Sequence, residues 1–202
     1  MKLDLVHDIQ AVYRKTLNSM SRPGLISNIR KQADQVDLEA GCFPATLIMM
    51  LMLLDTEVTF QVYAGDAGET AKLINQLTYA TTAPAERADF IFVLHTAQGG
   101  DLEQALKAAY PGDLLDPHQA ATIIIETPSL TNEQDWILTG PGIEKESYVK
   151  VETKGNWVQL RAKKNGEYPL GVELIFTDPR GNILCLPRTT RITKKVVGSW
   201  DM

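Results

Sequence analysis

Residues 89–95 read DFIFVLH, and residues 121–126 read ATIIIE. Each is a short and almost continuous apolar run, which is typical of a parallel strand that is buried on both faces of a sheet. A third β-rich stretch, residues 58–63, precedes them, and helical patterns near 68–79 and 101–110 lie between the three runs. This alternation of strands and helices predicts βαβ units, and therefore an α/β fold with a largely parallel sheet.

Two helices are expected upstream of these strands. Residues 4–20 carry apolar side chains at mostly three- and four-residue steps, the spacing of one helical face: Leu5, Ile9, Val12, Tyr13 and Leu17. The sequence Ser-Arg-Pro-Gly at 21–24 then predicts a turn, with a short extended segment after it. Residues 44–54 are almost entirely apolar, so we expect a helix that is enclosed on most sides.

The C-terminal third predicts a turn, a short helix and a hairpin. A Gly-Pro-Gly turn at 140–142 follows a strand, and a short helix is expected around 155–165. Strands over 172–177 and 183–187 flank Asp-Pro-Arg-Gly-Asn, a strong hairpin turn. We place this hairpin at a sheet edge that a second copy of the chain covers, since Glu173 is the only ionisable side chain over 172–177.

Composition excludes several classes of protein. The 202 residues fit a single domain over 1–202, and a net charge of −5 argues against nucleic acid as a partner. The acidic N-terminus does not resemble a signal peptide, and the longest apolar run, 43–54, is too short for a membrane span. Two unclustered cysteines, Cys42 and Cys185, predict no metal site and no disulfide framework, so we expect a cytoplasmic protein.

Catalytic chemistry is hard to assign from the sequence. The phosphate-binding GxxxxGK[ST] motif, the dinucleotide fingerprint GxGxxG and the nucleophile elbow GxSxG are all absent. His7, His95 and His118 are scattered, and the ordinary interpretation of each is a surface or singly hydrogen-bonded histidine. His95 is the best exception, because ligands of α/β folds bind at the carboxyl ends of parallel strands.

Two segments could bind an anion. Gly140 and Gly142 could present backbone amides to one, although a plain turn explains the Gly-Pro-Gly sequence as well. Residues 188–191 offer two guanidiniums and two hydroxyls, which suit a phosphate or carboxylate group. If that segment is extended, Arg188 and Arg191 point to opposite faces, which favours salt bridges at a surface or interface instead.

Several motifs, in one order along the chain, resemble the PhnH subunit of carbon-phosphorus lyase. They span residues 13–191, which is nearly the whole domain. Glu173 and Tyr168 stand where that family more often has aspartate and phenylalanine. The matching motifs are Tyr13-Arg14, Met20-Ser21-Arg22-Pro23-Gly24, Leu51–Asp55, Gly140-Pro141-Gly142-Ile143, Asn165 with Pro169-Leu170-Gly171-Val172, and Leu186-Pro187-Arg188-Thr189-Thr190-Arg191.

The resemblance implies a three-layer sandwich similar to the pyridoxal-phosphate-dependent transferases, but without the cofactor site, and hence no cofactor. It also implies a homodimer when the chain is isolated, and assembly with the G, I and J subunits of carbon-phosphorus lyase. These subunits attach a phosphonate to ribose in place of the adenine of ATP. The candidate anion-binding or interface residues are Arg22, Gly140, Gly142, Arg188, Thr189, Thr190 and Arg191.

Three classes of function therefore remain open. The leading hypothesis is a non-catalytic assembly subunit of the carbon-phosphorus lyase core complex. The second is an autonomous transferase-like enzyme that uses His95 or the turn at 140–143. The third is a carrier that holds a phosphonate near Arg188 and Arg191.

Overall fold

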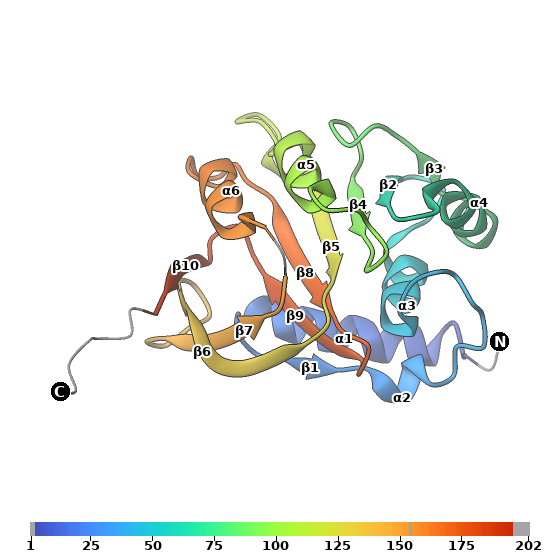
Figure 1. Ribbon diagram of the computed structural model, residues 1–202, viewed down its shortest axis with the longest axis horizontal. Coiled ribbons are helices and arrows are strands. Elements are labelled where there is room, and N and C mark those ends of the chain that lie inside the picture. Colours follow the sequence, from blue (N-terminus) through green and yellow to red (C-terminus); the bar gives the residue numbers. More distant parts are fainter. Residues whose placement is uncertain (1–2, 154, 196–202) are drawn as a thin grey trace.

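A seven-stranded sheet forms the middle layer of the protein, with helices on both faces (Figure 1). The computed structural model describes residues 3–153 and 155–195. The strand order is β1-β9-β8-β5-β4-β2-β3, and the five strands from β8 to β3 run parallel. The strands are β1 (Ser27–Asn28), β2 (Thr59–Tyr63), β3 (Thr81–Thr82), β4 (Phe90–Val93), β5 (Thr122–Glu126), β8 (Glu173–Thr177) and β9 (Asn182–Leu186). The predicted three-layer α/β class with a mixed, largely parallel sheet is confirmed, while the likeness to pyridoxal-phosphate-dependent transferases stays a prediction.

The two outer layers differ in composition. One contains helices alone, and the other combines helices with a three-stranded antiparallel sheet of order β10-β6-β7 (Figure 1). The first layer has α1 (His7–Ser21), α2 (Arg30–Ala33), α3 (Pro44–Leu53) and α4 (Ala67–Thr78); the second has α5 (Asp101–Ala108), α6 (Trp157–Lys164), β6 (Leu130–Thr139), β7 (Ser147–Val151) and β10 (Arg191–Lys194). A 3-10 turn covers Pro117–Gln119. None of the helices in the described ranges has the length and apolar content needed to cross a bilayer.

The central strands divide the core into two halves. Successive side chains of a strand point to opposite faces, so Phe92 and Ile124 join the core under α1, α3 and α4. Ile91 and Ile123 join the core under α5, α6 and the small sheet. All four are fully buried. The continuous apolar runs of the sequence therefore reflect burial on both faces of the sheet, as predicted.

The helix over 44–54 is confirmed as α3, and it is enclosed over most of its length. Residues 45–50 are buried, whereas the last turn, residues 51–53, is partly exposed. Its one buried polar side chain, Thr46, shares a 2.8 Å hydrogen bond with Thr177 Oγ1 at the end of β8. A hydroxyl can be buried here because its partner is buried beside it.

Helix α1 is confirmed, but the apolar face expected for it is partly wrong. Leu5, Tyr13 and Leu17 are about half exposed, at 57%, 51% and 49%. The residues that the helix buries are Val12 and two small polar ones, Thr16 and Ser19. The hydroxyl of Ser19 donates to Leu25 O and accepts from the backbone N–H of Cys185 in β9, so α1 lies close against that strand.

The C-terminal hairpin forms as predicted, but its placement at a sheet edge is wrong. Its strands, β8 and β9, pair in antiparallel fashion across the turn at 178–182, where buried Asp178 accepts from two backbone amides. However, β8 lies between β5 and β9, and β9 lies between β8 and β1. The edges of the large sheet are instead the two-residue strands β1 and β3. Strands β7 and β10 were not predicted.

The small sheet is attached to the end of α1 through Gly142. This residue has φ +82°, and a Cβ placed on it would come within 2.2 Å of Ser21 O and 3.0 Å of Pro23 Cδ. The first contact is with backbone, which cannot rotate away as a side chain can. The turn at 140–142 and the turn at 21–24 are therefore packed directly against each other.

We expect Gly142→Ala to lower the free energy of unfolding by about 3 kcal/mol, because it adds both backbone strain and a steric clash. Gly68→Ala is the matched control, since a Cβ there meets nothing within 4 Å and lies in α4. The control should leave stability unchanged or raise it by up to about 1 kcal/mol. Urea unfolding followed by tryptophan fluorescence measures both, and equal stabilities would contradict the proposed contact.

Candidate functional site

The candidate anion-binding segment at 188–191 forms a turn. The backbone N–H of Thr190 donates to Pro187 O at 2.9 Å, which closes the turn, and β10 begins at Arg191. The segment is therefore not extended, and its two arginines have different environments. Arg188 is largely buried, whereas Arg191 is exposed.

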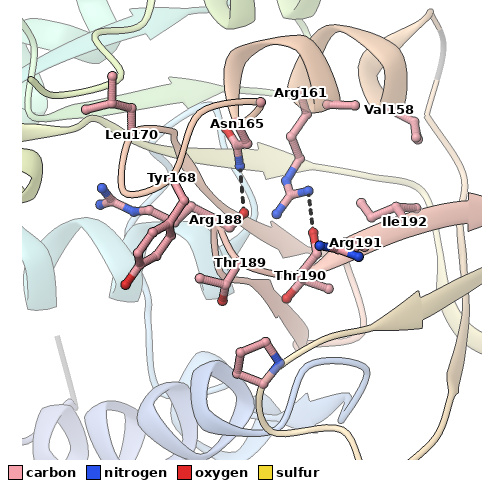
Figure 2. Close-up of a pocket in the computed structure, with 13 residues that line it drawn as sticks. Val158, Arg161, Asn165, Tyr168, Leu170, Arg188, Thr189, Thr190, Arg191 and Ile192 are labelled. Atoms are coloured by element: carbon pink, nitrogen blue, oxygen red, sulfur yellow. Dashed lines mark hydrogen bonds between the residues drawn. The ribbon is translucent and has the colours of Figure 1, made fainter. Parts of the chain in front are cut away.

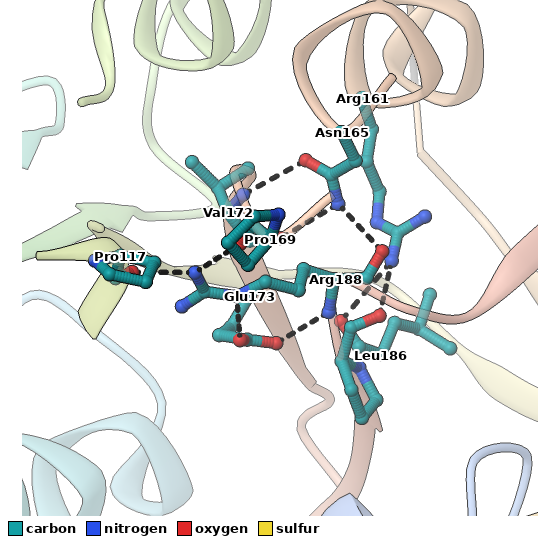
Figure 3. Close-up of polar contacts among 9 residues, drawn as sticks. Pro117, Arg161, Asn165, Pro169, Val172, Glu173, Leu186 and Arg188 are labelled. Carbon is teal, nitrogen blue, oxygen red and sulfur yellow. Dashed lines mark hydrogen bonds and ion pairs between the residues drawn. The ribbon is translucent and has the colours of Figure 1, made fainter. Parts of the chain in front are cut away.

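Arg188 is held by protein groups at its backbone N–H, Nε and Nη1 (Figure 3). Its Nε forms a 2.7 Å ion pair with Glu173 Oε1, and its backbone N–H donates to Glu173 Oε2 at 2.6 Å. Nη1 donates to Pro117 O at 2.6 Å and to Pro169 O at 3.0 Å. This guanidinium thus joins β8 to the chain at Pro117 and at Pro169. These contacts agree with the expectation that Arg188 forms a salt bridge.

A second arginine, Arg161 of α6, lies behind the same turn (Figure 3). It is only 2% exposed. Nη1 donates to Thr190 O at 2.9 Å, and Nη2 donates to Pro187 O at 2.6 Å and to Leu186 O at 3.5 Å. Among the described residues no carboxylate lies within ion-pair distance of it, so its direct hydrogen-bond partners are backbone carbonyls.

The electrostatics of this cluster favour positive charge. Burial lowers the pKa of the Arg161 guanidinium to about 10, and the nearby charge of Glu173 opposes part of that effect. Arg161 is therefore still charged at neutral pH. Glu173 interacts with both Arg161 and Arg188, so these three side chains together carry a net charge of +1.

A cavity of about 690 Å³ opens between α6, the turn at 187–190 and the start of β10 (Figure 2). Arg161 and Thr190 form its inner wall, and Tyr168 and Arg191 lie at its exposed side. Two buried polar atoms at this wall, Arg161 Nε and Thr190 Oγ1, have no hydrogen-bond partner in the described part of the chain. Guanidinium and hydroxyl donors around a positively charged cavity are suited to an anion.

The structure brings some, but not all, of the candidate residues to this cavity. Arg188, Thr189, Thr190 and Arg191 line it, together with Pro141, which lies between Gly140 and Gly142. Arg22 is exposed at the C-terminal end of α1 and is not among the lining residues. Over residues 3–153 and 155–195, no group of three or more His, Cys, Asp or Glu side chains is placed to hold a metal ion.

Sequence reasoning missed the importance of Arg161. Its position four residues after Trp157 and three after Val158 puts it on the buried face of α6, and this spacing was a usable signal. Asn165 was noted only as part of a motif. Its amide donates to Val172 O and Arg188 O, and its Oδ1 accepts from Val172 N, so it joins the end of α6 to the strands.

The chain matches known proteins over almost its full length. Residues 3–193 match a family model described as bacterial phosphonate metabolism protein (PhnH). HtxG of Stutzerimonas stutzeri, provisionally named a C-P lyase subunit, is 28% identical over 92% of this chain and 86% of its own length. The alpha-D-ribose 1-methylphosphonate 5-triphosphate synthase subunit PhnH of Rhizobium meliloti is 24% identical over 95% of this chain and 94% of its own length.

We expect Arg161→Met to lower the free energy of unfolding by about 2–3 kcal/mol, because three carbonyls lose a charged donor and are left buried. Arg191→Met is the matched control at the exposed side of the cavity, and it should change stability by less than about 0.5 kcal/mol. Urea denaturation of both variants provides the measurement. An Arg161→Met protein as stable as the control would show that the guanidinium does not support the turn.

Proposed function

Because the chain belongs to the PhnH family of bacterial phosphonate metabolism proteins, we propose that it is a non-catalytic subunit of a carbon-phosphorus lyase core complex. In this role it is cytoplasmic and assembles with subunits of the G, I and J types. The observation that carries the proposal is the match over residues 3–193, which includes nearly every element of the fold.

The reaction that the complex supports is the displacement of adenine from ATP by a phosphonate. The name of the Rhizobium meliloti relative, a synthase subunit for a ribose that bears a methylphosphonate and a triphosphate, agrees with such an exchange. In our proposal this chain contributes a rigid surface to the assembly. The ties that Arg161 and Arg188 form between α6, β8 and the turn at 187–190 support that role.

A carrier function is the second candidate, and the charge of the cavity favours it. Thr189, Thr190 and Arg191 would meet a phosphonate there, with Arg161 behind them. The contacts of Arg188 to Glu173, Pro117 and Pro169, and the packing of Gly142 on Ser21, favour structural roles for those residues. Arg22 and Gly140 stay candidates for an interface.

Self-association of the isolated chain is part of the proposal. The hairpin at 172–187 does not offer the edge on which this expectation was based. Other large apolar side chains are exposed, however, including Leu114, Leu115 and Tyr168 at 68%, 97% and 79%. Leu114 and Leu115 are adjacent in the chain, and contiguous exposed apolar surface is typical of a face that another polypeptide covers.

We expect co-expression of this chain with its G-, I- and J-type subunits to yield one stoichiometric complex by native mass spectrometry. That complex should release adenine from ATP and methylphosphonate, whereas this chain alone should not. A complex assembled without this chain should show a large loss of adenine release. A chain that purifies alone from the same cells would contradict the assembly role.

The two alternatives predict other results in the same experiment. Adenine release by the isolated chain would favour an autonomous transferase. Binding of methylphosphonate to the isolated chain, measured by calorimetry, would favour the carrier, and Arg191→Met should then weaken it at least about tenfold. Arg30→Met is the control, because Arg30 is an exposed arginine of α2 outside the residues that line the cavity.

We expect the isolated chain to sediment as a dimer at tens of micromolar, because a closed two-fold dimer is the commonest soluble homo-oligomer. Sedimentation velocity at several loading concentrations measures this. A single species of 22.4 kDa across the range would contradict self-association.

A further inference from the structure

Glu126 is a fully buried carboxylate at the end of β5, and no lysine or arginine among the described residues forms an ion pair with it. Its side chain is 0% exposed. Oε1 accepts from the backbone N–H of Phe43 at 2.5 Å. Oε2 accepts from the backbone N–H of His95 at 2.9 Å and lies 2.6 Å from His95 Nδ1. Among the described residues, the imidazole of His95 is the only side chain with a hydrogen bond to this carboxylate.

These contacts define how the proton is placed on the imidazole. Two backbone amides can only donate, and one of them belongs to Phe43, the residue that caps the N-terminus of α3. Donors and a helix N-terminus both favour the ionised carboxylate, which can only accept. The hydrogen between Glu126 and His95 therefore lies on Nδ1. In the neutral imidazole, Nε2 then carries a free lone pair.

His95 is also placed where a ligand can reach it. It follows β4, and Glu126 ends the neighbouring parallel strand β5, so both lie at the carboxyl edge of the sheet. The strand order reverses between β2 and β4, because β3 is added on one side of this pair and β5 on the other. Open α/β sheets usually bind ligands at the carboxyl ends of their strands. The cleft at His95 is lined by residues that follow β4 and β5, one strand pair away from this reversal.

The ring itself is held but not covered. It stacks on Phe43 with centroids 4.6 Å apart and planes 9° apart, and the side chain is 42% exposed. No described residue forms a hydrogen bond with Nε2. Burial raises the pKa of the neighbouring Cys42 thiol to about 12, so this thiol stays protonated at neutral pH and offers no nucleophile.

The other two histidines provide a comparison. His7 and His118 also lie beside carboxylates, Asp4 and Asp116, but their side chains are 82% and 86% exposed. Backbone amides also donate to Asp4, but Glu126 is the one carboxylate of the three that is fully buried. The orientation of His95 is therefore built into the fold.

A cleft of about 350 Å³ lies over His95 and Glu126, and it shares no lining residue with the cavity at Arg161. Glu103 and Glu152 also line it, and its described lining residues include no lysine or arginine. Lys154 lies outside the described residues. Three carboxylates disfavour an anionic ligand, whereas Gly99 and Gly100 leave room for a small compound beside the ring.

We propose that His95 and Glu126 form a second ligand site, in which His95 Nε2 accepts a hydroxyl hydrogen from a small, uncharged polyhydroxyl compound. Glu126 is the positioning residue, because it fixes the tautomer without touching the ligand. The site is separate from the anion cavity and does not depend on assembly with other subunits.

Nitrogen-15 NMR of the histidine rings tests the site in the full chain. We expect the neutral His95 ring to be the Nδ1–H tautomer, whereas a free neutral imidazole in water prefers the opposite tautomer. D-ribose should shift the His95 Nε2 signal in a saturable way and leave His118 unchanged. D-ribose 5-phosphate should bind at least about tenfold more weakly, because the carboxylates repel it.

Variants separate the ligand site from a merely structural pair. Glu126→Gln should remove the tautomer preference and weaken ribose binding at least about tenfold, while Asp116→Asn, the matched change beside His118, should alter neither. His95→Gln keeps a donor for Glu126 and should abolish the ribose response in a folded protein. The Nε2–H tautomer at His95, no response to ribose, or tighter binding of the phosphate would each overturn the proposal.

Discussion

The buried guanidinium of Arg161 is the interaction on which the C-terminal half of the structure depends. It binds carbonyls of residues 186, 187 and 190, at the point where the chain leaves the large sheet and enters the small one. Without a carboxylate beside it, the charge is tolerated only because these carbonyl dipoles converge on it. The position of α6, the shape of the turn and the start of β10 are thus determined together.

Much of the large sheet could be predicted from sequence, because strands that are buried on both faces consist almost entirely of apolar residues. The same logic could have corrected the position of the hairpin. Residues 174–177 and 183–186 are continuously buried, as a central strand requires, and only the turn between them was given weight. Strands β7 and β10 are short and partly exposed, so their sequences carry little apolar signal.

The candidate site was harder to predict because its contacts join distant segments. Glu173 and Arg188 meet across two strands, and nothing in their local sequence indicates the pairing. His95 and Glu126 could each be placed at the end of a strand, but their contact follows only from β4 lying beside β5. In α1, Thr16 and Ser19 take buried positions where the helix lies close to β9, so hydrophobic spacing predicted only part of the buried face correctly.

The large sheet ends on each side in a strand of two residues, β1 and β3. Such short edges give an incoming peptide almost no backbone to pair with, so strand addition is a poor route to a partner through this sheet. Recognition there must rely on side chains of helices and loops. Those can be replaced one at a time without changing strand register, so the surface is free to diverge while the sheet is preserved. The two relatives are only 28% and 24% identical, yet they align over more than nine tenths of this chain. This agrees with a fold that is kept while its surface side chains change.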